Sequence, residues 1–192
     1  MTGNGYFCNP PRGQIEVISG PMFSAKTEEL IRRLTKCLIA KQKIQVFKPK
    51  TDDRDNGLFK KDHISSRSGF SHPATVVENS TELISKIEEG TDVVAVDEAQ
   101  FFDDDLPEEL DKLANRGLRV IVAGLDTDYM GKPFGPLPGL LCRAEAVDKM
   151  MAVCTICGNP AAKTYRKGQH DTYIVVGDTD VYEARCRSCA QK

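Results

Sequence analysis

Residues 20–27 carry the strongest chemical signal in the chain, because their types and order are typical of a phosphate-binding loop. They read Gly-Pro-Met-Phe-Ser-Ala-Lys-Thr. In such a loop successive backbone N–H groups face a polyphosphate. Lys26 would reach the terminal phosphates, and the Thr27 hydroxyl would hold Mg²⁺. Ala25 replaces the second glycine of the usual pattern, so an ordinary strand-to-helix turn is the alternative that this segment leaves open.

Two adjacent acids, Asp97 and Glu98, follow an apolar run that starts at Val93. A strand that ends in Asp, downstream of a phosphate loop, indicates a magnesium-associated strand, because ligands gather at the carboxyl ends of parallel strands. We expect the Glu98 side chain to point away from Asp97, since neighbours on a strand alternate. It could then accept a proton during phosphoryl transfer to a hydroxyl. Solvated acids at a strand end are the alternative.

A third polar group, Asp52-Asp53-Arg54, follows another expected strand. The guanidinium could neutralise charge on a transferred phosphoryl group, and an Asp could hold metal-bound water. A solvated charge run explains these residues equally well.

Four of the seven cysteines form two Cys-x-x-Cys pairs, Cys154 with Cys157 and Cys186 with Cys189. Four thiolates from two such turns suit a closed, tetrahedral structural Zn²⁺ site. The metal would tie together the base of the long loop between the pairs. A redox dithiol and an iron–sulfur site remain as alternatives.

The apolar periodicity predicts the elements that must position these groups. Strands are expected at 14–19, 43–48, 74–77, 92–96, 118–123 and 146–153, and helices at 28–34, 80–89 (with Ser80 as N-cap) and 106–115. This alternation predicts an α/β fold of the P-loop NTPase type, a mostly parallel sheet with helices on both faces. Loops are expected at 50–73 and 125–140, and short β-segments at 162–166 and 172–176.

The composition suggests three parts. Residues 1–13 are expected to be a flexible terminus, 14–152 the α/β domain, and 153–192 a zinc-bound segment too small to bury a core alone. The net charge of -2 argues against a dedicated nucleic-acid binder. Without an 18-residue apolar run or a signal peptide, we expect a cytoplasmic protein that does not bind membranes.

Together these motifs resemble those of the small zinc-containing thymidine kinases. The similarity extends from about residue 14 to 189, and Asp-Glu-x-Gln-Phe-Phe with the distal cysteine pairs is its most specific part. The matching segments are 20–30, Asp52-x-Arg54, 96–102, Gly124-Leu125-Asp126, Lys132-Pro133-Phe134-Gly135 and the two cysteine pairs.

The resemblance implies transfer of the ATP γ-phosphate to the 5′-hydroxyl of thymidine to give dTMP, with Glu98 as general base. It assigns ATP and its phosphates to Gly20, Pro21, Met22, Phe23, Ser24, Ala25, Lys26, Thr27 and Arg54, and Mg²⁺ to Thr27, Asp97 and Asp52. It assigns the nucleoside to Met22, Phe101, Leu125, Tyr129, Thr164, Tyr173, Val175 and Tyr182, and Zn²⁺ to Cys154, Cys157, Cys186 and Cys189. The loop between the cysteine pairs would be a lasso over the nucleoside. The family is typically homotetrameric and inhibited by dTTP.

The chain departs from the family pattern at Ala25 and over residues 55–70. If the backbone at Ala25 needs a positive φ, alanine costs roughly 1–2 kcal/mol; if it is helical, alanine costs little. Two alternatives therefore stay open. One is a catalytically impaired protein that binds nucleoside or dTTP, and the other is a zinc-ribbon ATPase acting on nucleic acid, which would need a basic stripe that the sequence lacks.

Overall fold

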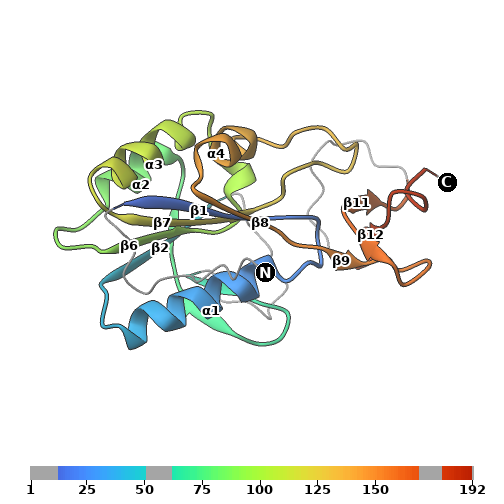
Figure 1. Ribbon diagram of the computed structural model, residues 1–192, viewed down its shortest axis with the longest axis horizontal. Helices are drawn as coiled ribbons and strands as arrows, with labels where there is room; N and C mark the ends of the chain where they lie inside the picture. Colours follow the sequence, from blue (N-terminus) through green and yellow to red (C-terminus); the bar gives the residue numbers. More distant parts are fainter. Residues whose placement is uncertain (1–12, 51–61, 169–178, 192) are drawn as a thin grey trace.

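A six-stranded parallel sheet forms the centre of the molecule, which we describe from a computed structural model over residues 13–50, 62–168 and 179–191 (Figure 1). The strand order is β5-β2-β6-β7-β1-β8, and every neighbouring pair is parallel. The strands are β1 (Gln14–Ser19), β2 (Ile44–Pro49), β5 (Thr75–Val77), β6 (Val93–Val96), β7 (Arg119–Gly124) and β8 (Ala146–Lys149). The predicted parallel α/β architecture is confirmed.

Helices cover both faces of this sheet (Figure 1). One face carries α1 (Lys26–Ile39), and the other carries α2 (Ser80–Ser85), α3 (Leu106–Asn115) and α4 (Leu137–Arg143). Strand β6 shows why its sequence is continuously apolar. Val94 and Val96 pack in the cluster that includes α3 and α4, whereas Val93 and Ala95 pack in the cluster that includes α1. Since both faces are covered, every position needs an apolar side chain.

A buried ion network ties α1 to the sheet. The Glu16 carboxylate on β1 is fully buried and accepts hydrogen bonds from Arg33 Nη1 at 2.7 Å and Arg119 Nε at 2.6 Å. Arg33 also contacts Glu29 at 2.9 Å and Asp148. Burial lowers the pKa of Arg119, but the hydrogen bond to Glu16 outweighs this and raises it. Each buried charge thus has a partner of opposite sign, as burial requires.

Four predictions about loops and helices were wrong. Within the expected loop 50–73, β3 (His63–Ser65) and β4 (Ser71–Pro73) form an antiparallel hairpin. The expected loop 125–140 contains the start of α4. Helix α2 ends at Ser85, and its N-cap is Asn79, whose side chain accepts the Glu82 N–H at 2.9 Å. Ser80 instead donates its N–H and its hydroxyl to Asp103, at 2.7 and 2.5 Å.

In its described residues, the C-terminal segment forms two small antiparallel ladders. The expected strand 146–153 is divided into β8 and β9 (Ala152–Val153). Strand β9 pairs with β10 (Pro160–Ala161), and β11 (Lys163–Arg166) pairs with β12 (Tyr182–Arg185). Their own core is small, built around Ala152, Cys154, Ala161 and Ala184. The expected flexible terminus at 1–13 lies outside the described residues except for Gly13, and the expected strand at 172–176 lies wholly outside them (1–12, 51–61, 169–178 and 192 are not described).

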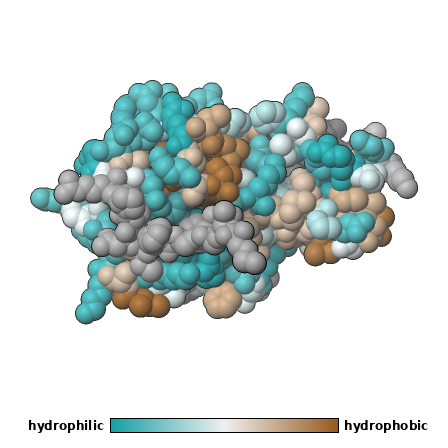
Figure 2. All heavy atoms as spheres, viewed as in Figure 1, coloured by the Kyte–Doolittle hydropathy of each residue, from teal (hydrophilic) through white to brown (hydrophobic). Residues whose placement is uncertain are grey.

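The surface of the molecule is described by its hydropathy. The face shown in Figure 2 is mostly hydrophilic, with smaller apolar areas between. In the described part of the chain, the helices are too short or too polar to cross a membrane.

Candidate functional site: a phosphate loop beside paired acids and a cysteine cluster

The loop between β1 and α1 has an unusual backbone. Gly20 has φ 144, and a Cβ there would lie 2.4 Å from the Met150 carbonyl oxygen, so only glycine fits. Phe23 (φ 66) and Ala25 (φ 62) are both left-handed. Of the two backbone conformations considered for Ala25, the structure has the one with positive φ and not the helical one. This conformation costs a non-glycine residue roughly 1–2 kcal/mol. This positive φ explains why the phosphate-loop pattern has a glycine at this position.

The first two side chains of the helix after this loop each make a hydrogen bond near it. Helix α1 begins at Lys26, whose Nζ donates to the Pro21 carbonyl oxygen at 2.7 Å. Thr27 Oγ1 donates to Asp97 Oδ2 at 3.0 Å. The first turn of α1 therefore meets the end of β6, and the positive end of the helix faces the same place.

This contact fits a magnesium site. Two oxygens in adjacent positions of an octahedron with bonds of about 2.1 Å lie about 3.0 Å apart. The oxygens of Thr27 and Asp97 have that separation. Asp52, the third expected ligand, and Arg54, the expected phosphate contact, lie outside the described residues.

Asp97 and Glu98 lie beyond the strand rather than in it. Strand β6 ends at Val96, and Glu98 is left-handed, with φ 50. The expected alternation of side chains along a strand therefore does not apply to Asp97 and Glu98, because both residues follow the strand and Glu98 is in a left-handed turn. Asp97 is buried and accepts the Glu98 N–H at 3.0 Å, whereas Glu98 is half-buried.

Gln100, for which no separate role was predicted, joins this group. It lies in the short 3₁₀ helix η1 (Ala99–Phe101) and is 3 % exposed. Its Nε2 donates to Glu98 Oε2 at 2.5 Å, and its Oε1 accepts the Leu125 N–H at 2.9 Å. The signal that could have found it is its place two residues after Glu98, in the most specific motif of the chain.

The residues assigned to the nucleoside come from several segments, and the structure joins some of them. Met22 N donates to the hydroxyl of Thr164, which is buried in β11, at 3.0 Å. The Phe101 ring stands edge-on to Phe134, with centroids 5.7 Å apart.

Two more of the nucleoside residues lie at the β11–β12 ladder, and two are not described. The Arg166 guanidinium lies 3.6 Å from the Tyr129 ring centre, and Tyr182 is buried in β12. Tyr173 and Val175 lie outside the described residues.

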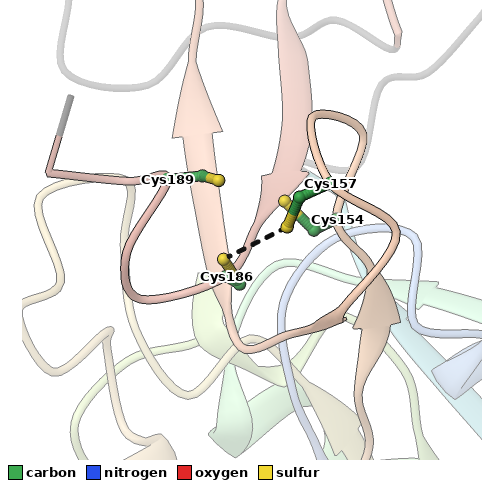
Figure 3. A group of neighbouring side chains, drawn as sticks. All are labelled: Cys154, Cys157, Cys186 and Cys189. Atoms are coloured by element: carbon green, nitrogen blue, oxygen red, sulfur yellow. Dashed lines mark hydrogen bonds between the residues drawn. The ribbon is translucent and has the colours of Figure 1, made fainter.

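The four cysteines converge as predicted (Figure 3). Their sulfur atoms all lie within 4.8 Å of one another, and the sulfurs of Cys157 and Cys186 are 3.7 Å apart. Tetrahedral Zn²⁺ with Zn–S bonds of about 2.3 Å sets sulfurs about 3.8 Å apart. The cluster could therefore hold zinc.

The pKa values of these thiols shift in opposite directions, as expected for thiols that crowd together without a cation. A backbone N–H of Cys186 lowers the pKa of Cys154 to about 6. The hydrogen bond from its thiol to Cys186 raises the pKa of Cys189 to about 12. Neighbouring thiolates repel one another, so without a cation they cannot all ionise, and a dication would remove that conflict.

The phosphate loop also contacts the small core beside the cysteine cluster. Phe23, Cys186 and Cys189 all pack against this core, which contains Cys154. On the β3–β4 hairpin, the Arg67 guanidinium lies 4.3 Å from the centre of the Phe23 ring. The phosphate loop is thus held between the hairpin and the C-terminal segment.

Comparison with known proteins gives one family. A model of the family described as thymidine kinase matches residues 13–190. Among solved structures, domain III of the replication initiation protein DnaA from Thermotoga maritima is similar at 17% identity, with a TM-score of 0.44. That similarity covers 73% of this chain and 56% of that one, and at this level it carries no argument about function.

Proposed function

Because the chain belongs to the thymidine kinase family, we propose that it transfers the γ-phosphate of ATP to the 5′-hydroxyl of thymidine. The observation that carries the proposal is the contact of Thr27 with Asp97, which sets the phosphate loop beside Glu98. A phosphate donor, a metal site and a base would then meet at one edge of the sheet.

The phosphate loop would bind ATP through its backbone N–H groups and Lys26. The 2.7 Å contact of Lys26 with Pro21 keeps the ammonium folded over the loop, where it could move to a phosphate oxygen. Thr27 and Asp97, with Asp52, would hold Mg²⁺, which when bound neutralises charge on the phosphates. Arg54 would contact phosphate.

Glu98 would act as the general base. As O5′ forms its bond to the γ-phosphorus, the bond from that phosphorus to the bridging oxygen of the β-phosphate breaks. ADP leaves with the electron pair, and the Glu98 carboxylate takes the proton of the hydroxyl. The half-buried position of Glu98 supports this role, because a base must be reachable by substrate and screened from water.

Thymidine would lie between the two parts of the chain. Leu125, Phe101 and Tyr129 would bind it from the α/β body, while Thr164 and Tyr182, with Tyr173 and Val175, would bind it from the C-terminal segment. Met22 belongs to the phosphate loop, so its hydrogen bond to Thr164 supports a site at this junction. A zinc ion on the four cysteines would anchor the segment. We also propose dTTP as feedback inhibitor and a homotetrameric assembly.

The test is a kinase assay with Mg-ATP and a panel of nucleosides, comparing Glu98→Gln with the parent. We expect thymidine to be phosphorylated and kcat to fall roughly 10²–10⁴-fold in the variant, while thymidine still binds. Glu89→Gln, which changes an exposed acid at the other end of the sheet, serves as the control. A variant with nearly parental kcat would remove Glu98 from the mechanism.

The left-handed conformation of Ala25 favours one second candidate function. Because this strain falls on the phosphate loop, the chain could bind thymidine or dTTP without phosphorylating thymidine. The same assay separates the two. Binding of thymidine with no dTMP formed by the parent chain would favour the binding protein.

A further inference from the structure

We infer that Gln100 is a positioning residue, which holds the Glu98 carboxylate in the orientation needed to take a proton. The inference rests on the proposed role of Glu98. Gln100 is not assigned to touch substrate or the reacting atoms; it acts through its neighbour.

The hydrogen bonds of Gln100 use both ends of its amide. The NH₂ group donates to Glu98 Oε2 at 2.5 Å, and the carbonyl oxygen accepts the Leu125 N–H at 2.9 Å. Since Leu125 follows β7, the side chain spans from the end of β6 to the end of the adjacent strand. This second bond fixes the amide, so that its NH₂ group and not its oxygen faces Glu98.

The surroundings of Gln100 are shaped to admit it. A Cβ on Gly124 would lie 2.9 Å from Gln100 Oε1, and a Cβ on Gly135 would lie 2.2 Å from the Gln100 carbonyl oxygen. Gly135 is also left-handed, with φ 50. Two glycines thus let neighbouring backbone approach the residue closely, and the side chain is 3 % exposed. A long polar side chain in such a place has little freedom to move.

Glu98 needs such a restraint. Its side chain has three rotatable bonds, it is half-buried, and it leaves the backbone from a left-handed position. A displacement of about 1 Å of a reacting group can cost on the order of 10²-fold in rate. A hydrogen bond from a fixed, neutral donor holds the carboxylate while leaving it charged. A second acid in the place of Gln100 would repel it instead.

Gln100→Glu tests the hydrogen bond to Glu98 at constant side-chain size. The change keeps an oxygen for the Leu125 N–H, but replaces the NH₂ group that faces Glu98 with a second acid, which repels the Glu98 carboxylate. We expect kcat to fall about 10- to 100-fold while the KM for ATP stays within about threefold. Gln100→Met, which removes both bonds, should lower kcat at least as far.

A double-mutant cycle separates positioning from a merely structural role. If Gln100 acts through Glu98, then adding Gln100→Met to Glu98→Gln should change the residual kcat less than about twofold. Gln45→Met is the matched control: Gln45 also bonds at both ends of its amide, to Lys86 and Thr91, but on the far part of β2. Its kcat should equal that of the parent, and thermal unfolding checks that all variants fold.

Two results overturn the inference. One is a Gln100→Glu variant with nearly parental kcat. The other is an additive cycle, in which Gln100→Met lowers kcat by the same factor with and without Glu98→Gln. If Glu98→Gln alone keeps nearly parental kcat, the proposed base is wrong and the inference fails with it; in the first two cases the base assignment stands.

Discussion

The sharpest test of the phosphate loop is Ala25→Gly. Ala25 has φ 62 and ψ 30, with no side-chain cap on α1. Releasing alanine from this left-handed conformation gains roughly 1–2 kcal/mol. The greater freedom of glycine in the unfolded chain takes back about 0.4–1 kcal/mol. The difference is a gain of roughly 1 kcal/mol, which raises Tm by about 2–4 °C for a chain of this length.

The assay compares thermal unfolding and ATP kinetics in the parent and the variant. The groups that would hold phosphate are the backbone N–H donors, Lys26 and Thr27, and Ala25→Gly removes none of them. We therefore expect kcat/KM for ATP to change less than about tenfold, equivalent to under roughly 1.4 kcal/mol. Lys41→Gly is the control, because Lys41 is also left-handed, with φ 59, but lies after the other end of α1. It should gain similar stability without any effect on ATP.

Two outcomes would contradict this reasoning. A loss of stability in Ala25→Gly, with the expected gain in Lys41→Gly, would show that the alanine side chain contributes contacts worth more than its strain. A rise in activity of several orders of magnitude would mean that the Cβ of Ala25 obstructs the phosphates. The natural chain would then be an impaired kinase or a nucleoside-binding protein.

Three further perturbations test other parts of the structure. Arg33→Met leaves a buried carboxylate short of one partner, so urea unfolding should show a loss of roughly 3 kcal/mol, whereas Arg32→Met, at its exposed neighbour, should stay within about 0.5 kcal/mol. Burial raises the pKa of Asp103, but its hydrogen bonds outweigh this and lower the pKa below the usual 3.8. The ionised carboxylate therefore stabilises the fold, and Asp103→Asn should lose a constant amount of stability above about pH 5. That loss should vanish as the pH falls below 3.8 and the carboxylate of the parent protein is protonated. Cys186→Ser should abolish bound zinc by elemental analysis and lower Tm, whereas Cys142→Ser, at an exposed cysteine outside the cluster, should keep the metal; parental zinc content in Cys186→Ser would exclude that ligand.

The sequence predicts the sheet well because burial on both faces leaves a strong pattern. Strand β6 is a continuous apolar run and β7 is one after Arg119, and all residues of both strands are buried in the structure. The β3–β4 hairpin gives no such pattern: of its strand residues only Ile64 is buried, and Ile64 packs in the cluster that includes α1, which is distant in sequence. The sequence around helix α4 is rich in proline and glycine, which indicated a loop, although Leu137 and Leu140 of the helix are buried.

The candidate site also has parts that the sequence predicts and parts that it does not. Spacing alone predicts that Thr27 meets Asp97, since parallel strands bring their carboxyl ends to one edge, and it predicts that the cysteine pairs converge. Backbone conformation is different. The glycine that the phosphate-loop pattern has at position 25 indicates the left-handed turn at Ala25, whereas no local pattern reports the one at Glu98. The role of Gln100 depends on Leu125, which is 25 residues away, and so required the structure.

The hydrogen bond from Met22 to Thr164 joins residues 142 positions apart, and it limits how such a protein can be recombined. The composition places a boundary near residue 152, which would invite a chimaera with the body of one parent and the cysteine segment of another. The Met22 amide and the Phe23 ring, however, both find their partners across that boundary. A working hybrid must therefore carry compatible partners on both sides of the junction, so the phosphate loop and the cysteine segment are inherited as a matched pair.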